Sequence, residues 1–158
     1  MREPEAARPR SQSRSFRHAV RLSLHRPPEQ RCAWQVRFPD VPEALTEGET
    51  EVEAHALAAD ALIAALGGLV KLRRDLPVPS TDSGNVVVLP MLQAAKLALC
   101  QAMREQGLTN VALAQNLGLH EGEVRRMLDL DHQTKIGTLE NALRHLGKQV
   151  TSEVRAAA

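Results

Sequence analysis

Two prolines three residues apart, Pro39 and Pro42, constrain this chain more than any other local feature. Proline cannot donate a hydrogen bond to a strand ladder, and it breaks the interior of a helix. A strand must therefore end before the pair, and a new element must begin after it. Asp40 lies between the prolines and more acidic residues follow, so the pattern predicts a stiff corner that carries negative charge.

The segments before this corner alternate apolar and polar residues, which is typical of half-buried strands. One such segment is Phe16–Leu24 and the other is Cys32–Phe38, with a Pro-Pro turn at 25–31 between them. This arrangement predicts an antiparallel hairpin. After the corner, residues 43–48 are expected to form a short third strand that ends at Gly48.

A long helix is predicted directly after the third strand. Thr50 and Glu53 have the spacing of a capping box, and acidic residues in a first turn are favoured by the helix dipole. Two glycines leave the end of this helix open within residues 65–73. The run Val86–Leu89 predicts a fourth, buried strand, so the first half has the order β-β-β-α-β. The apolar stripe of the helix is expected at Val52, Ala56, Ala59, Ile63, Leu66 and Val70.

The second half predicts helices, because a proline or threonine at the start and a glycine at the end bracket most of its apolar segments. The expected helices cover residues 90–106, 109–117 and 120–128, and a fourth is capped by Thr138 and ended by Gly147. The sequence leaves a final strand over 148–154 open. The predicted fold class is α+β, with a small sheet and one helix followed by an all-helical domain.

Residues 110–129, NVALAQNLGLHEGEVRRMLD, have the pattern of a helix-turn-helix. The small Ala114 stands where the two helices would cross, and Gly118 stands where the turn can require a left-handed backbone. An ordinary helical hairpin would share part of this pattern. The small residue, the glycine and the apolar residues all stand at the positions expected for a helix-turn-helix, however, and this favours DNA binding. The inward face is expected to consist of Leu113, Leu117, Leu119, Val124 and Met127.

In a helix-turn-helix the second helix enters the major groove, and its first residues reach base edges. Arginines there contact guanine or phosphate, and either acid of this helix could accept from a cytosine amino group. The module has no net charge, so it is expected to bind a palindromic operator as a dimer, helped by the arginine-rich arm. The residues predicted to contact DNA are Thr109, His120, Glu121, Glu123, Arg125, Arg126 and Lys135.

Charge is distributed unevenly along a nearly neutral chain. Residues 1–31 contain eight Arg against three Glu, whereas residues 32–80 contain eight acidic and four basic residues. Such segments suit different partners. Residues 1–15 have no apolar period and are predicted to be a disordered basic arm. The acidic middle would be a solvated surface by default, but a rigid corner lowers the cost of binding and negative charge steers a basic partner.

The sequence predicts neither catalysis nor a metal or other cofactor. Three acids, Asp40, Glu43 and Asp60, have no structural reason to converge on metal ions, and the histidines lack ligand spacing. No apolar run approaches the ~20 residues that cross a membrane, and no secretory signal is seen. Cys32 and Cys100 are expected to be buried reduced thiols of a cytoplasmic protein.

The whole pattern over residues 16–155 resembles the HicB family of bacterial type II antitoxins. The resemblance lies in WQVRFPDVPEALTEGET with the following EVEAHALAADALIAAL, in LPVPS, and in the helical segment through Lys148. It implies a partial ribonuclease H-like domain over 16–89 that lacks catalytic acids and covers a small basic mRNA-cleaving toxin of the HicA type. It also implies a helix-turn-helix domain over 90–150, with 151–158 as a tail, that represses the toxin–antitoxin operon as a dimer or higher oligomer. The expected toxin-binding residues are Phe38, Pro39, Asp40, Glu43, Glu47 and Glu49.

Two other functions stay open at this point. One is a stand-alone helix-turn-helix regulator whose first domain senses a small molecule. The other is a metal-dependent nuclease, which would lose its activity in Asp40→Asn.

Overall fold

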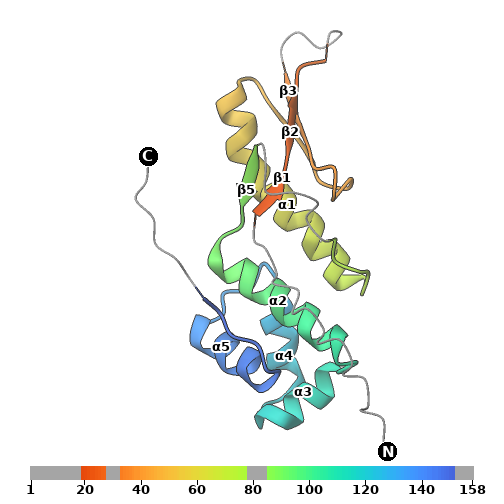
Figure 1. Cartoon of the computed structure of the whole chain (residues 1–158), viewed down its shortest axis with the longest axis vertical. Helices are drawn as coiled ribbons and strands as arrows, with labels where there is room; N and C mark the ends of the chain where they lie inside the picture. The colour runs from red at the N-terminus through yellow and green to blue at the C-terminus, as the bar shows by residue number, and fades with distance from the viewer. Residues whose placement is uncertain (1–18, 28–32, 78–84, 152–158) are drawn as a thin grey trace, which may run out of the picture.

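The computed structural model describes residues 19–27, 33–77 and 85–151, and it confirms the α+β class. A small β-sheet half with one long helix lies at one end of an elongated molecule, and four helices lie at the other end (Figure 1). The basic arm, the Pro-Pro turn and the C-terminal tail fall largely or wholly outside the described residues. The elements in order are β1 (Ala19–Arg21), β2 (Ser23–His25), β3 (Trp34–Arg37), β4 (Leu45–Gly48), α1 (Glu51–Lys71), β5 (Val86–Val88), α2 (Met91–Glu105), α3 (Asn110–Leu117), α4 (Glu121–Leu128) and α5 (Ile136–His145).

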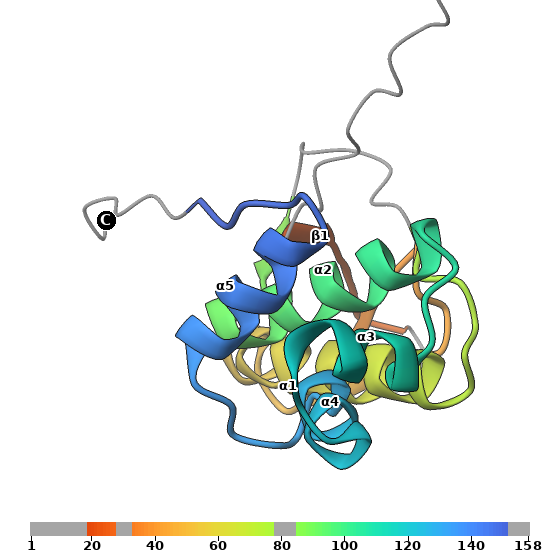
Figure 2. The ribbon, with the colours of Figure 1, turned by 90° about the horizontal axis from the view of Figure 1, so that it is seen from below.

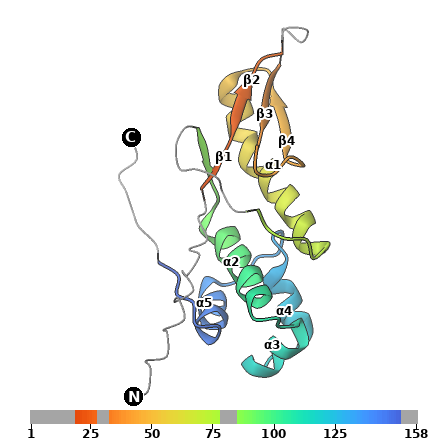
Figure 3. The same cartoon turned by 45° about the vertical axis from the view of Figure 1, so that its right-hand side comes forward.

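The predicted hairpin and third strand form an antiparallel sheet in the order β2-β3-β4. Leu24 pairs with Val36, and Val36 pairs with Thr46, so one register runs through all three strands. Helix α1 packs against β3 and β4 and covers one face of the sheet (Figure 3). Val36 and Phe38 are fully buried beneath it.

The first predicted strand is in fact two strands. β1 pairs with β5, with Val20 opposite Val87, whereas β2 pairs with β3. Between them the N–H of Leu22 donates to the carbonyl of Asn85 at 2.9 Å. The alternation of side chains continues through this change of partner, because it depends on the pleat and not on which strand lies alongside. Val87 is buried in β5, but Val88 is 61% exposed, so the predicted fully buried strand has one open face.

Helix α1 begins as predicted and continues through both glycines to Lys71. The hydroxyl of Thr50 accepts from the N–H of Glu53 at 3.1 Å, and the Glu53 carboxylate accepts from the N–H of Glu49 at 2.9 Å. The reciprocal bond therefore reaches one residue further back than in a standard capping box.

The predicted apolar stripe of α1 was partly wrong. Val52 is 81% exposed and Ala56 is exposed as well. Alanine and leucine occur on nearly every side of this helix, so its periodicity does not single out one face. The residues that face the core are Ala54, Ala58, Leu62, Leu66, Gly67 and Leu69.

By length and mean hydropathy alone, α1 could cross a membrane, although polar residues interrupt its apolar run. Its buried residues, however, lie on the face that packs on β3 and β4, and the Thr50 cap with two acids opens its first turn. These are the features of a core helix that covers a sheet.

The second half consists of α2–α5, seen from the far end of the molecule in Figure 2. Gly118 adopts the predicted left-handed backbone, with φ +66°, between α3 and α4. The fourth helix was placed too late, because α5 begins at Ile136 with Lys135 as its N-cap and Thr138 lies within its first turn. Residues 148–151 form no strand, and Val150 packs against the helices.

Two hydrophobic cores correspond to the two halves, but they meet. The first contains the sheet residues and the buried face of α1, and the second contains the facing sides of α2–α5. Leu97 of α2 and Leu130, which follows α4, belong to the first core and not to the second. The helical half is therefore packed directly onto the β-sheet half.

Candidate partner-binding surfaces

The proline corner consists of two consecutive tight turns. The N–H of Val41 donates to the carbonyl of Phe38 at 3.0 Å, and the N–H of Ala44 donates to the carbonyl of Val41 at 2.9 Å. Pro39 and Pro42 each occupy the second position of a turn, where their fixed φ is already suitable. The three residues that open and close the turns are buried, so the corner is anchored in the core every third residue.

The corner presents its acids differently from the sequence expectation. Asp40 and Glu43 take the third position of the two turns, with Asp40 half-buried and Glu43 exposed. Phe38, predicted to face a toxin, is only 1% exposed and supports the corner from inside the core. Pro39 is exposed. The surface of the corner is thus formed by prolines and carboxylates, without the aromatic ring.

Strand β4 continues this surface toward the start of α1. Glu47 pairs with Gln35 and Leu45 pairs with Arg37, and the side chains of Leu45 and Glu47 are exposed. Leu45 is 55% exposed, an apolar side chain among polar ones. The toxin-binding residues expected from the sequence do not include it, although the alternation of side chains along β4 exposes Leu45 and Glu47 alike. Arg37 lies on the same face, so the surface is not uniformly acidic.

One acid of the corner already has a basic partner, which lies just beyond the C-terminal end of α1. The guanidinium of Arg74 lies 3.6 Å from the carboxylate of Glu43, and both side chains are largely exposed. An exposed pair of this kind stabilises by about 0–1 kcal/mol. Glu43 can therefore exchange this partner for another cation at little cost.

The second candidate surface is formed by α3 and α4, joined through residues 118–120. The helices are held by Leu113, Ala114, Val124 and Met127, all of them buried as predicted, while Leu117 and Leu119 pack at the margin. Thr109 caps α3 by accepting from the N–H of Ala112 at 3.1 Å. This is the compact two-helix arrangement with a left-handed glycine that the sequence predicted.

The two acids of α4 are engaged within the helix itself. The Glu123 carboxylate accepts from the N–H of His120 at 2.9 Å and so closes the first turn. Both oxygens of Glu121 accept from the guanidinium of Arg125 at 3.0 Å. Both acids therefore stabilise the helix in which they lie. Because the Glu123 carboxylate is already engaged, it is less suited to accepting from a base than the sequence suggested.

The basic residues on this surface differ in their availability. Arg125 is held by Glu121, whereas the side chain of Arg126 is exposed and forms no hydrogen bond or ion pair with any residue in the described ranges. His120 and Lys135 are exposed as well, at the starts of α4 and α5. Cationic and hydrogen-bonding groups thus remain on α4 and on the start of α5.

Within residues 19–27, 33–77 and 85–151 no three His, Cys, Asp or Glu side chains gather as ligands. Cys100 is buried and free, and burial raises the pKa of its thiol from 9.0 to about 11. Cys32 lies outside the described residues.

Comparisons with known proteins agree on one family. Residues 23–98 match a family described as HicB_like antitoxin of bacterial toxin-antitoxin system. Antitoxin HicB 2 of Photorhabdus laumondii subsp. laumondii is 40% identical over 87% of this chain and 96% of its own length. Antitoxin HicB 1 of the same organism is 34% identical over 89% of this chain and 88% of its own length. Antitoxin HicB of Escherichia coli K12 is 34% identical over 75% of this chain and 87% of its own length.

Each of these relatives is named an antitoxin, and antitoxins of this family are not enzymes. Their similarity extends through both the β-sheet half and the helical half. The chain therefore belongs to the HicB family of antitoxins of bacterial toxin–antitoxin systems.

Proposed function

We propose that this antitoxin neutralises a small basic mRNA-cleaving toxin of the HicA type through its β-sheet half and represses its own operon through α3 and α4. The observation that carries the first part is the double turn at 38–44, which holds acids on an ordered backbone. Membership of an antitoxin family supports a toxin as the partner, and the acidic surface at this corner supports a basic one.

The proposed toxin-binding surface consists of Pro39, Asp40, Glu43, Leu45, Glu47 and Glu49. Its backbone is fixed by two turns and by strand pairing, so little conformational entropy is lost on binding. The acids steer a basic toxin toward it, and this attraction is screened beyond about 8 Å at physiological salt. Lasting affinity then needs an apolar contact, which Leu45 provides at 55% exposure.

The test uses the purified toxin encoded beside this gene, with cleavage of an mRNA as the readout. An equimolar amount of the chain is expected to stop cleavage. Glu43→Gln with Glu47→Gln should slow association about tenfold at low salt, because steering falls with the lost charge. Glu140→Gln, which removes one exposed acid of α5, is the control for loss of a charge away from this surface. A toxin that stays active in the equimolar mixture contradicts the proposal.

The proposed operator-binding surface is the exposed side of α4 with the start of α5. The side chain of Arg126 is free to contact a base edge or phosphate, and Arg125 is oriented by Glu121. Lys135, the N-cap of α5, is expected to contact the phosphate backbone of the DNA. Because α4 carries two acids and two arginines, a single copy has little electrostatic affinity for DNA. We therefore expect a dimer on a palindromic operator, with two copies of α4 in successive major grooves.

Operator binding is tested on DNA from upstream of the gene by fluorescence anisotropy over a salt series. Arg126→Ala is expected to weaken binding roughly tenfold to a hundredfold, as for loss of one base or phosphate contact. Arg144→Ala, an exposed arginine of α5, is the control and should change little. Equal loss in both variants would show only a non-specific charge effect and would reject α4 as the reading helix.

A further inference from the structure

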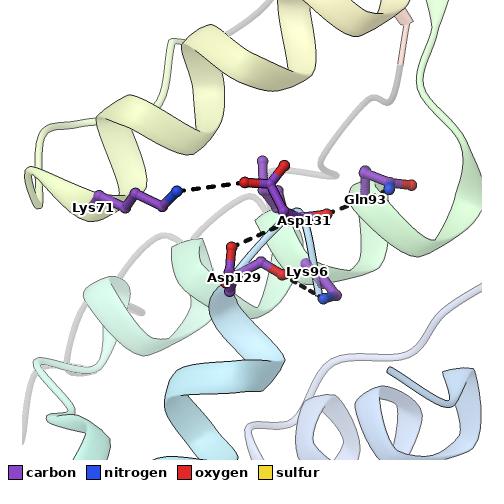
Figure 4. A network of polar contacts seen from close by, with 6 residues as sticks. Lys71, Gln93, Lys96, Asp129 and Asp131 are labelled. Carbon is purple, nitrogen blue, oxygen red and sulfur yellow. Dashed lines mark hydrogen bonds and ion pairs between the residues drawn. The ribbon is translucent and has the colours of Figure 1, made fainter. Parts of the chain in front are cut away.

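The turn that follows α4, residues 129–132, is held from both halves of the molecule (Figure 4). From α2, the ammonium of Lys96 donates to the carbonyls of Asp129 and His132, and the amide of Gln93 donates to the carbonyl of Leu130 at 3.5 Å. From α1, the ammonium of Lys71 lies 3.4 Å from the carboxylate of Asp131. A turn of four residues thus has partners on two other helices.

The side chain of Leu130 anchors the same turn in the β-sheet half. Leu130 is 3% exposed and belongs to the first hydrophobic core. It packs against Gly67 of α1, where an added Cβ would lie 3.8 Å from the Leu130 Cδ1. A Cβ at this position would be in ordinary van der Waals contact with the leucine, so Leu130 lies directly against this turn of α1. Consequently the residue two positions after α4 is part of the other domain's core.

Lys96 is an unusual residue for this position, because it is fully buried and lysine almost never is. Burial lowers the pKa of its ammonium, while Asp129 and Asp131 raise it in part, and Cys100 also faces the group. An apolar side chain would fill the space without this cost of desolvation. Unlike an apolar side chain, lysine forms directional hydrogen bonds, and its ammonium holds two backbone carbonyls in one arrangement. One of them belongs to the C-cap of α4.

We propose that Lys96 and Leu130 are positioning residues that fix the orientation of α4 relative to the β-sheet half. This inference rests on the proposed operator binding by α4. The helix has only eight residues and its C-cap is Asp129, so a clamp on residues 129–132 fixes one end of α4 directly. A dimer must place two such helices about 34–36 Å apart on DNA. If the orientation of α4 were not fixed, only a fraction of the dimers would have that spacing at any time. The apparent affinity for the operator would then fall in proportion to that fraction.

The experiment compares the full chain with Lys96→Met, Leu130→Ala and Lys148→Met. Methionine is unbranched like lysine, is one atom shorter, and removes the donors. Lys148→Met is the control because Lys148 forms its ion pair with Glu105, away from the turn. Residual dipolar couplings measured on the folded proteins give the alignment of the β-sheet half and of α4. Operator and toxin affinities are measured on the same samples.

For the full chain and the control we expect one common alignment of both halves. For Lys96→Met and Leu130→Ala we expect two different alignments, operator binding about tenfold weaker, and toxin binding within about twofold of the full chain, because the toxin-binding surface is untouched. A role in stability alone would lower the melting temperature and leave the alignment common, and this result overturns the proposal.

The design separates failure of this inference from failure of the proposed function. If the full chain binds its operator and both variants bind it equally well, the positioning role is wrong and operator binding stands. If the full chain binds no upstream DNA, operator binding is wrong and the positioning role falls with it. Should Lys96→Met fail to fold, Leu130→Ala carries the same comparison without a change in charge.

Discussion

Gly48, the last residue of β4, lies so close to α1 that a Cβ at this position would be 2.5 Å from the backbone nitrogen of Ala54. The contact is with backbone, so no rotation of a side chain can relieve it. It joins the end of the strand to the first turn of the helix. Gly48 also follows Glu47 and precedes Glu49, so it fixes the place of two acids on the proposed toxin-binding surface.

Gly48→Ala is expected to destabilise the protein by roughly 1–3 kcal/mol or more, since the strand and α1 must separate to admit a methyl group. Urea denaturation followed by circular dichroism measures this change. Gly122→Ala is the matched control, because nothing lies within 4 Å of its added Cβ and alanine favours a helix by about 1 kcal/mol. Equal stability of the two variants would contradict the close contact.

Two threonines, Thr50 and Thr138, were expected to be N-caps of helices, and the structure confirms only one of them. Thr50 caps α1 through its hydroxyl, whereas Thr138, expected to cap the last helix, lies inside α5. Thr50→Ala should cost about 1 kcal/mol of unfolding free energy, as loss of an N-cap usually does. Thr138→Ala should cost nothing or stabilise slightly. A loss at Thr138 as large as that at Thr50 would restore the later start of α5.

Local backbone chemistry was predictable from sequence because its causes lie within a few residues. The Thr50 cap, the left-handed Gly118 and the ends of β3 at the corner all follow from side chains that act on their own backbone. The burial of Phe38 was also readable, since it shares the alternation of Trp34 and Val36. Its assignment to the toxin surface came from the family resemblance and overlooked that alternation.

Long-range choices were not predictable from the same patterns. The switch of partner between β1 and β2 leaves the alternation unchanged, and the alanine-rich α1 offers several apolar faces of similar quality. Nothing in the sequence pattern singles out Lys96 among the charged residues of the helices. Only the fold brings the carbonyls of residues 129 and 132 to its ammonium. The position of Leu130 was not predictable either, because it follows α4 in the sequence but packs in the hydrophobic core of the β-sheet half.

Two buried groups give opposite pH dependences at alkaline pH. Burial raises the pKa of Cys100 from 9.0 to about 11, so the unfolded chain loses this proton first and stability falls as pH rises between these values. Burial lowers the pKa of Lys96 below 10.5, so the unfolded chain holds this proton more tightly and stability rises with pH up to 10.5. Arg104 also faces Cys100, and Asp129 and Asp131 face Lys96.

Denaturation between pH 9 and about 11 is expected to separate the two effects. Cys100→Ala should remove a fall on the order of 2 kcal/mol, so stability declines less than in the unchanged chain. Lys96→Met should remove the rise, so stability declines more steeply. Cys32 is present in both variants and provides a common background. Parallel curves for all three proteins would mean that neither group is perturbed in the folded state.

Leu45 and Phe38 are expected to affect toxin binding in different ways. Leu45→Ala removes an exposed apolar contact and should weaken binding by about 1 kcal/mol or more, roughly fivefold, with little change in stability. Phe38→Ala should instead cost about 3–5 kcal/mol of unfolding free energy, because it empties a buried site. Isothermal titration with the purified toxin and urea denaturation measure the two quantities.

The control for Leu45 is Val111→Ala, which truncates another side chain more than half exposed, on α3 of the helical half. It should leave toxin affinity unchanged if the toxin binds the β-sheet half. Loss of affinity in Val111→Ala and not in Leu45→Ala would move the toxin-binding surface to the helices. In that case the acids of the corner would be a solvated surface, and the rigid turns at 38–44 would serve the fold alone.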